Sequence, residues 1–198
     1  AAASCRNTQC LRFFQTIDRP EALAARDENR ANLLRRDPVI KGYLPGVPRG
    51  MNMPFPFQII QSQQHIMIVH EYAGAVRTIY MDNHTEAPAD SWMGWSNGHW
   101  DGDTLVIETT NYSSQARFRG ASDNLHMVER LTRVGPRTLD YEVTITDPTT
   151  WTRPWTVMIP LMGSDDAIFE YACHEGNYGL FNMLSGARVE EATFTSGQ

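Results

Sequence analysis

The stretch WMGWSNGHWDGDTLVIETT, residues 92–110, decides how this chain folds. It turns sharply at Asp101-Gly102-Asp103, where glycine supplies the positive φ that a tight hairpin needs. After the turn, apolar and polar residues alternate, which places every second side chain of residues 104–110 on the same face. The stretch therefore predicts a β-hairpin whose first arm is rich in aromatic residues.

Alternating segments of this kind continue through most of the chain after residue 57. The expected strands are 57–61, 65–72, 75–81, 93–100, 104–110, 125–134, 138–146, 155–162 and 168–174. Short turns separate many of them, which favours antiparallel neighbours, because parallel neighbours need a long crossover. The sequence therefore predicts a mainly β protein. Its antiparallel meander either closes as an up-and-down, lipocalin-like barrel, which we favour, or stacks as a sandwich.

The residues before the expected sheet have a different character. Residues 21–36 are rich in Ala, Leu, Arg and Glu and predict a surface helix that packs outside the barrel or plugs one of its ends. Four prolines and three glycines then predict an extended connector. We expect a single domain over residues 1–198, made of an N-terminal helical segment (1–40), a Pro/Gly-rich connector (41–56) and the barrel (57–190).

Composition limits the classes of function. The 198 residues carry a net charge of −6, which argues against a nucleic-acid-binding surface. No apolar run approaches the roughly 18 residues that span a membrane. The small residues at positions 1–4 resemble a signal-peptide cleavage product and favour a secreted or periplasmic location. Cys5, Cys10 and Cys173 allow at most one internal disulfide, and neither its pairing nor its presence follows from the sequence.

Three charged or polar residues interrupt apolar strand faces. Glu129 shares its face with Leu125, Met127 and Leu131, and Arg77 and His70 lie on similar faces. Burying such groups costs several kcal/mol unless they are paired, so each needs a partner or a function. Two interpretations stay open: a buried Glu129–Arg77 ion pair beside a hydrogen-bonded His70, or an acid/base and substrate-orienting set inside a cavity.

The candidate site residues form two groups. The acid/base candidates are Glu129, Glu108, His126 and His70. The ligand-contact candidates are Arg77, Glu71, Tyr80, Trp100, Tyr141, Trp155 and Glu170. No H-E-x-x-H or Cys-x-x-Cys spacing and no nucleotide-binding fingerprint is present, so we expect neither a metal nor a cofactor.

A series of motifs resembles a known family. They include WDGDTLVIET (100–109), VER (128–130), TITDP (144–148) and EYACHE (170–175). In wording and order they resemble a family of exported bacterial proteins to which no function has been assigned. The resemblance implies export and a β-rich fold, and it implies no reaction. The chain departs from the family pattern at Asp101, where the family usually has Glu, and at Trp95, where the family usually has His.

Three functions are compatible with these observations. The leading hypothesis is an exported β-barrel that binds a small, largely apolar or aromatic molecule in its interior, with Glu129 and Arg77 orienting it. The second is a cofactor-free lyase, isomerase or hydrolase that uses a Glu/His pair. The third is an accessory subunit of an envelope complex, in contact with a partner protein or a second copy of the chain.

Overall fold

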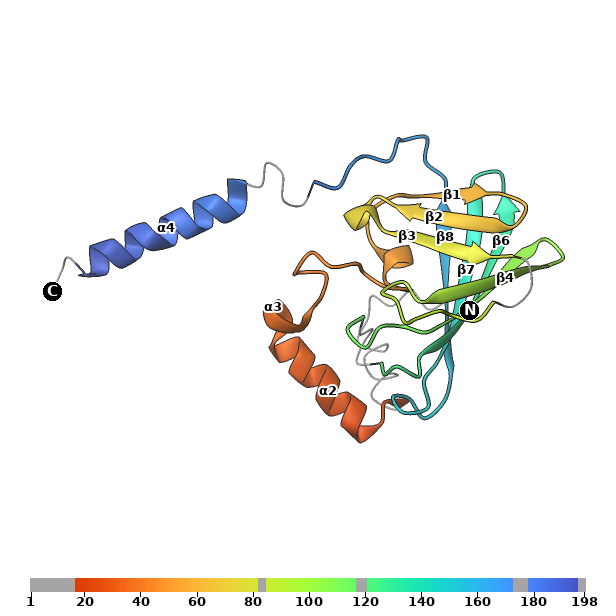
Figure 1. Cartoon of the computed structure of the whole chain (residues 1–198), viewed down its shortest axis with the longest axis horizontal. Helices are drawn as coiled ribbons and strands as arrows, with labels where there is room; N and C mark the ends of the chain where they lie inside the picture. Colours follow the sequence, from red (N-terminus) through yellow and green to blue (C-terminus); the bar gives the residue numbers. More distant parts are fainter. Residues whose placement is uncertain (1–16, 82–84, 117–120, 173–177, 196–198) are drawn as a thin grey trace.

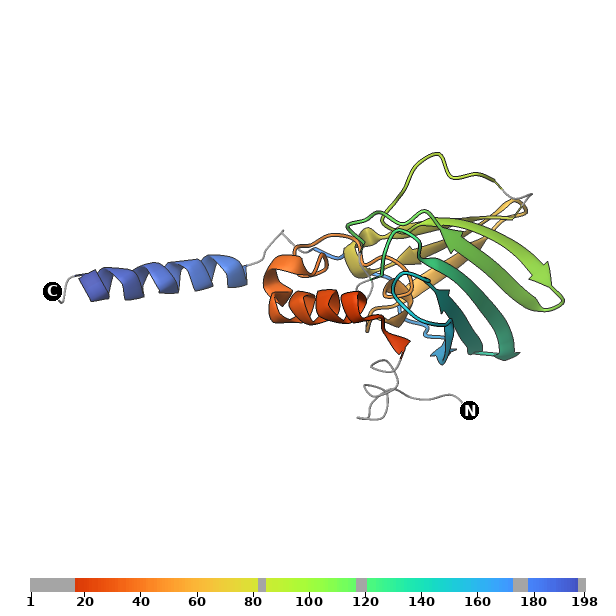
Figure 2. The same ribbon diagram turned by 90° about the horizontal axis from the view of Figure 1, so that it is seen from below.

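The computed structural model describes residues 17–81, 85–116, 121–172 and 178–195 (Figures 1 and 2). Eight strands form one sheet in this part of the chain. Their bounds are β1 Phe57–Gln61, β2 His65–His70, β3 Val76–Tyr80, β4 Trp95–Asp101, β5 Thr104–Thr110, β6 His126–Gly135, β7 Thr138–Thr146 and β8 Trp155–Met162. The predicted mainly β fold is confirmed.

The strands follow one another across the sheet in sequence order. Every neighbouring pair is antiparallel except β3 and β4, which pair in parallel over Ile79–Ser96 and Tyr80–Asn97. The expectation of a purely antiparallel meander is wrong at this step. The chain between Tyr80 and Trp95 is long enough to return to the starting end of the sheet, as a parallel pair requires.

The sheet curls into a half-barrel and does not close (Figure 2). Its edge strands, β1 and β8, pair only with β2 and β7. The core lies on the inner face of the curl, where Ile66, Ile79, Ile107 and Ile145 are among the buried residues. A barrel without closure keeps part of this inner face accessible between the two edges.

The N-terminal segment forms two short helices outside the sheet. Helix α2 spans Pro20–Ala31 and helix α3 spans Leu33–Arg36, so the predicted helix is confirmed with an interruption at Asn32. Ala22 is the one buried residue of α2. The η1 turn, Gly50–Asn52, lies in the connector, and its Met51 is buried in the core. Of the two predicted placements, the helix therefore takes the one outside the sheet, and the connector contributes a side chain to the core.

The chain after β8 differs from the expected ninth strand at 168–174. Residues 168–172 form no strand, and positions 173–174 lie outside the described residues, as do all three cysteines. Tyr171 packs on Tyr72 and Phe55, with ring centroids 4.7 and 5.4 Å away, so apolar contact holds this segment in place of strand pairing. The sheet thus ends at Met162 rather than near residue 190.

A C-terminal helix that the sequence analysis did not predict follows this segment. Helix α4, Tyr178–Thr195, points away from the half-barrel (Figure 1). Its large apolar side chains are mostly exposed, among them Tyr178, Phe181, Met183, Leu184 and Val189.

Candidate functional site

A buried polar cluster lies on the inner face of the half-barrel. Arg77 projects from β3 and Glu129 from β6, and strand alternation places both with the core. The exposed fractions of their side chains are 1% and 0%. Ser96 of β4, Thr109 of β5 and Tyr141 of β7 complete the cluster. The predicted burial of both Arg77 and Glu129 is confirmed.

The guanidinium and the carboxylate form a bidentate ion pair. Arg77 Nη1 donates to Glu129 Oε1 at 3.0 Å, and Nη2 donates to Oε2. Two further guanidinium hydrogens are donated to Ser96 Oγ at 2.9 Å and to Thr109 Oγ1 at 2.7 Å. Tyr141 donates its hydroxyl to Glu129 Oε1 at 2.7 Å. A buried pair needs this kind of additional hydrogen bonding to offset its loss of hydration.

Electrostatics keep Arg77 charged and Tyr141 protonated. Burial alone would lower the pKa of the Arg77 guanidinium, but the adjoining Glu129 carboxylate outweighs it and the pKa lies above its ordinary value. Burial and the same carboxylate raise the pKa of Tyr141 well above its ordinary value, so its hydroxyl stays a donor. The cluster is therefore a hydrogen-bonded network, and neither Arg77 nor Glu129 lines the groove between β1 and β8 or the hollow beside Trp100.

His70 lies near this cluster without sharing its hydrogen bonds. Its side chain, on β2, is 3% exposed, and no described residue hydrogen-bonds its Nε2. The ring lies close to Gly50: a Cβ added at Gly50 would lie 3.4 Å from His70 Cε1. Burial, followed by repulsion from Arg77, lowers the pKa of His70 to about 4. The imidazole is therefore neutral in the folded protein at pH 7.

Acidification is expected to destabilise the fold through His70. Because the unfolded state binds a proton near the ordinary pKa of 6.5 and the folded state near 4, stability falls as the pH decreases between these values. We expect a loss of about 2 kcal/mol between pH 7 and pH 5. Urea unfolding at both pH values measures it, with His70→Asn as the non-titrating control. Equal losses in both proteins would contradict the assignment.

The other acid/base candidates meet on the outer face of the sheet. His126 Nε2 lies 2.6 Å from Glu108 Oε1, so the two side chains are within hydrogen-bond reach. Both side chains are substantially exposed to solvent. Neither lines the groove between β1 and β8 or the hollow beside Trp100. The pair therefore has suitable groups for proton transfer but no enclosed space in which to hold a substrate.

A groove of about 850 Å³ opens between the two edges of the sheet. Phe57 and Ile59 of β1 line one side, and Leu139 of β7 and Leu161 of β8 line another. Ile59 pairs with the buried Ile68 and so faces the interior, yet its side chain is 36% exposed. This exposure is the direct result of the unclosed barrel. The walls of the groove are largely apolar, which makes it the candidate ligand site.

The connector, the chain after β8 and the β6–β7 hairpin with Arg133 and Arg137 form further parts of the groove. Met51, Met53 and Phe55 contribute from the connector, and Ile168 contributes from the later segment. None of these residues was predicted from the sequence to belong to a site. A signal was present, because apolar residues recur at alternate positions from Met51 to Ile59, as they do along one face of an extended chain.

The remaining ligand-contact candidates are dispersed. Glu71 Oε2 accepts a hydrogen bond from the Phe169 backbone at 3.0 Å, and Tyr80 stacks on Trp95 with centroids 4.4 Å apart. Trp155 is buried against Trp151. Glu170 is exposed, and Trp100 lines a second hollow near the β4–β5 turn. The structure does not bring these residues together into one site, and their roles stay predictions.

In comparisons with known proteins, no family model, curated protein or solved structure matches this chain. The described residues contain no group of three or more His, Cys, Asp or Glu side chains placed to share a metal ion. Within the described ranges, no helix combines the length and the apolar character that crossing a membrane requires. The fold defines the chain as a curled β half-barrel, and its chemistry must be inferred from its own hollows.

Proposed function

We propose that this protein binds a small, largely apolar molecule in the groove between β1 and β8. The interior-facing Ile59 carries this proposal, because it is an apolar residue on the core face of the sheet that stays 36% exposed to the groove. The groove, at about 850 Å³, falls within the range of 300–1,000 Å³ that is typical of ligand pockets. Export of the protein, which the family resemblance implies, is part of the same proposal.

The charges at the rim indicate which ligands suit the groove. Arg137 is already bonded to the Asp165 carboxylate at 2.8 Å and to the Gly163 carbonyl at 2.8 Å. Arg133 donates to the Pro136 carbonyl at 2.7 Å. Because these guanidinium groups have protein partners, the apolar walls are the main source of binding free energy. A neutral or weakly polar molecule fits better than a strongly charged one.

The neutral fluorescent probe N-phenyl-1-naphthylamine is expected to bind in the groove. Replacing Ile59 by Gln should weaken its binding roughly tenfold, because losing the apolar contact of one side chain costs about 1–2 kcal/mol. Fluorescence titration measures the Kd. Ile60→Gln is the matched control, because Ile60 is the next residue of β1, faces outward and is 46% exposed. Equal effects of the two replacements, or no probe binding by the unmodified protein, would contradict the proposal.

The accessory-subunit alternative also has an observation in its favour. Helix α4 projects from the half-barrel with Phe181, Leu184 and Val189 exposed, and apolar side chains gathered on one helix are typical of surfaces that contact another protein. Native mass spectrometry of the protein purified from its own host separates the two functions. A bound small molecule supports the groove proposal, and a bound partner chain supports the alternative.

A further inference from the structure

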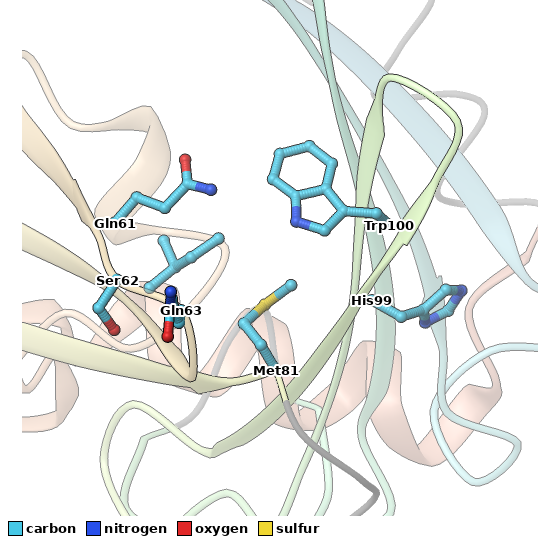
Figure 3. A pocket seen from close by; sticks show the side chains of 7 residues that line it. Gln61, Ser62, Gln63, Met81, His99 and Trp100 are labelled. Atoms are coloured by element: carbon cyan, nitrogen blue, oxygen red, sulfur yellow. The ribbon is translucent and has the colours of Figure 1, made fainter.

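A second hollow, of about 710 Å³, lies where the β1–β2 turn faces the β4–β5 hairpin. Gln61, Ser62 and Gln63 line it from the turn, and Trp100 lines it from the hairpin (Figure 3). None of its lining residues also lines the groove between β1 and β8. It is therefore a separate hollow, and we call it the turn cleft.

Glycine at position 98 sets the shape of the turn cleft. A Cβ on Gly98 would lie 2.6 Å from Ile79 Cγ2 and 2.9 Å from Met81 Sδ, so β4 can approach β3 this closely only because the side chain is absent. Two residues further on, Trp100 lies on the same side of β4 as Gly98. The close packing at Gly98 thus fixes the strand that carries the indole.

The indole of Trp100 is an exposed aromatic surface within the cleft. Its side chain is 50% exposed, although this face of β4 is buried at Ser96. Figure 3 shows the ring directed toward Gln61 and Met81 across the opening, while His99 points away. Ile66 and Met81 supply further apolar surface. An apolar platform of this kind suits the flat face of a ring.

The opposite wall supplies neutral hydrogen-bonding groups. The structure gives the side-chain amides of Gln61 and Gln63 no hydrogen bond to a described residue, so both retain their donors and acceptor. Ser62, in contrast, is engaged with His65: its hydroxyl donates to the His65 carbonyl at 2.8 Å and accepts from the His65 backbone N–H at 3.0 Å. No Asp, Glu, Lys or Arg among the described residues lines the cleft.

We propose that the turn cleft binds a neutral pyranose ring of a saccharide, with the ring stacked on Trp100 and its hydroxyl groups bonded to Gln61 and Gln63. A sugar ring has one apolar face and a polar edge, which matches an aromatic platform opposite two free amides. A wholly apolar ligand would make no use of these two exposed amides. An anionic ligand would find no described cation in the lining.

Isothermal titration calorimetry with cellohexaose, maltohexaose and chitohexaose tests the proposal. Binding of at least one of them is expected, and Trp100→Ala is expected to weaken it at least tenfold. Trp100→Phe, which keeps an aromatic face, should weaken it less. Gln61→Ala combined with Gln63→Ala should also weaken it. Phe169→Ala is the control, because Phe169 is an exposed aromatic residue that lies outside the cleft lining.

Two results would overturn the proposal: no binding of any of the three saccharides at 10 mM, or equal affinity of the Trp100→Ala variant and the unmodified protein. The unfolding midpoint of each variant is measured to show that it is folded. Because Trp100 is exposed, its replacement should leave the midpoint unchanged. Adding N-phenyl-1-naphthylamine distinguishes the two sites. The Trp100→Ala variant should bind this probe normally, so failure of the saccharide site leaves the groove proposal intact.

Discussion

Replacing Glu129 by Gln lowers the free energy of unfolding by about 3–5 kcal/mol, the range expected when one partner of a buried ion pair is removed. Arg77 would keep its charge in a position where its side chain is 1% exposed, with no carboxylate to offset the lost hydration. Gln preserves the shape of the side chain, so the loss reports charge rather than packing. Urea denaturation at pH 7, followed by circular dichroism, measures it.

Two controls separate the charge from the hydrogen bonds. Tyr141→Phe removes one of the two hydrogen bonds that Glu129 Oε1 accepts and leaves the bond from Arg77, so it should cost less, about 2 kcal/mol. Replacing both partners, Arg77→Met with Glu129→Leu, removes both charges and should restore much of the stability lost in Glu129→Gln. If Glu129→Gln unfolds like the unmodified protein, the carboxylate is not buried against Arg77 and the cluster is wrongly assigned.

The same variant decides whether Glu129 orients a ligand, as the sequence suggested. The structure places the carboxylate outside the lining of the groove. Under conditions where the variant is folded, its affinity for N-phenyl-1-naphthylamine should therefore equal that of the unmodified protein. The ion pair then acts on the fold: it links β3 to β6 across the interior of the curled sheet.

Much of the sheet follows from the sequence. The predicted bounds of β5, β7 and β8 are those observed, because clear alternation and short turns define these strands. Alternation also predicted that Glu129 and Arg77 lie inside. Within a hairpin, each strand pairs with its sequence neighbour, so local pattern determines register.

Closure and the last elements do not follow from local pattern. Whether β1 meets β8 depends on the curl accumulated over all eight strands, which no single segment encodes. The predicted ninth strand failed because its apolar side chains have another use, with Tyr171 packed on Tyr72. Helix α4 was missed because the chain after residue 174 was read as part of the barrel, whereas the sheet ends at Met162.

The candidate site was predicted less well than the fold, because residues in the most distinctive motifs stabilise the fold and do not line the groove. In the TITDP motif, Asp147 is 1% exposed and accepts hydrogen bonds from the Ser122 and Thr149 backbones at 2.6 and 2.9 Å. It anchors a turn. The groove, in contrast, draws its walls from the connector, β1, the β6–β7 turn, β7, β8 and the segment after β8. Residues so far apart in sequence share no motif.

Gly94, immediately before β4, is the second position where a large effect is expected. Its φ is +70°, and a Cβ would lie 2.7 Å from Thr109 Cγ2, 2.8 Å from Tyr112 Cε1 and 2.9 Å from the Thr110 carbonyl oxygen. Left-handed backbone costs a non-glycine residue about 1–2 kcal/mol, and overpacking typically adds 1–3. Gly94→Ala should therefore lower the free energy of unfolding by about 3 kcal/mol.

Gly102→Ala is the matched control, because Gly102 has a φ of +58° but no atom within 4 Å of the Cβ position. It should lose only the backbone part, about 1–2 kcal/mol, and the difference between the variants measures the close packing. Equal losses would contradict that packing. Thr109, which a Cβ on Gly94 would displace, also accepts a hydrogen bond from Arg77. Gly94→Ala and Glu129→Gln should therefore be non-additive when combined, since both disturb one network.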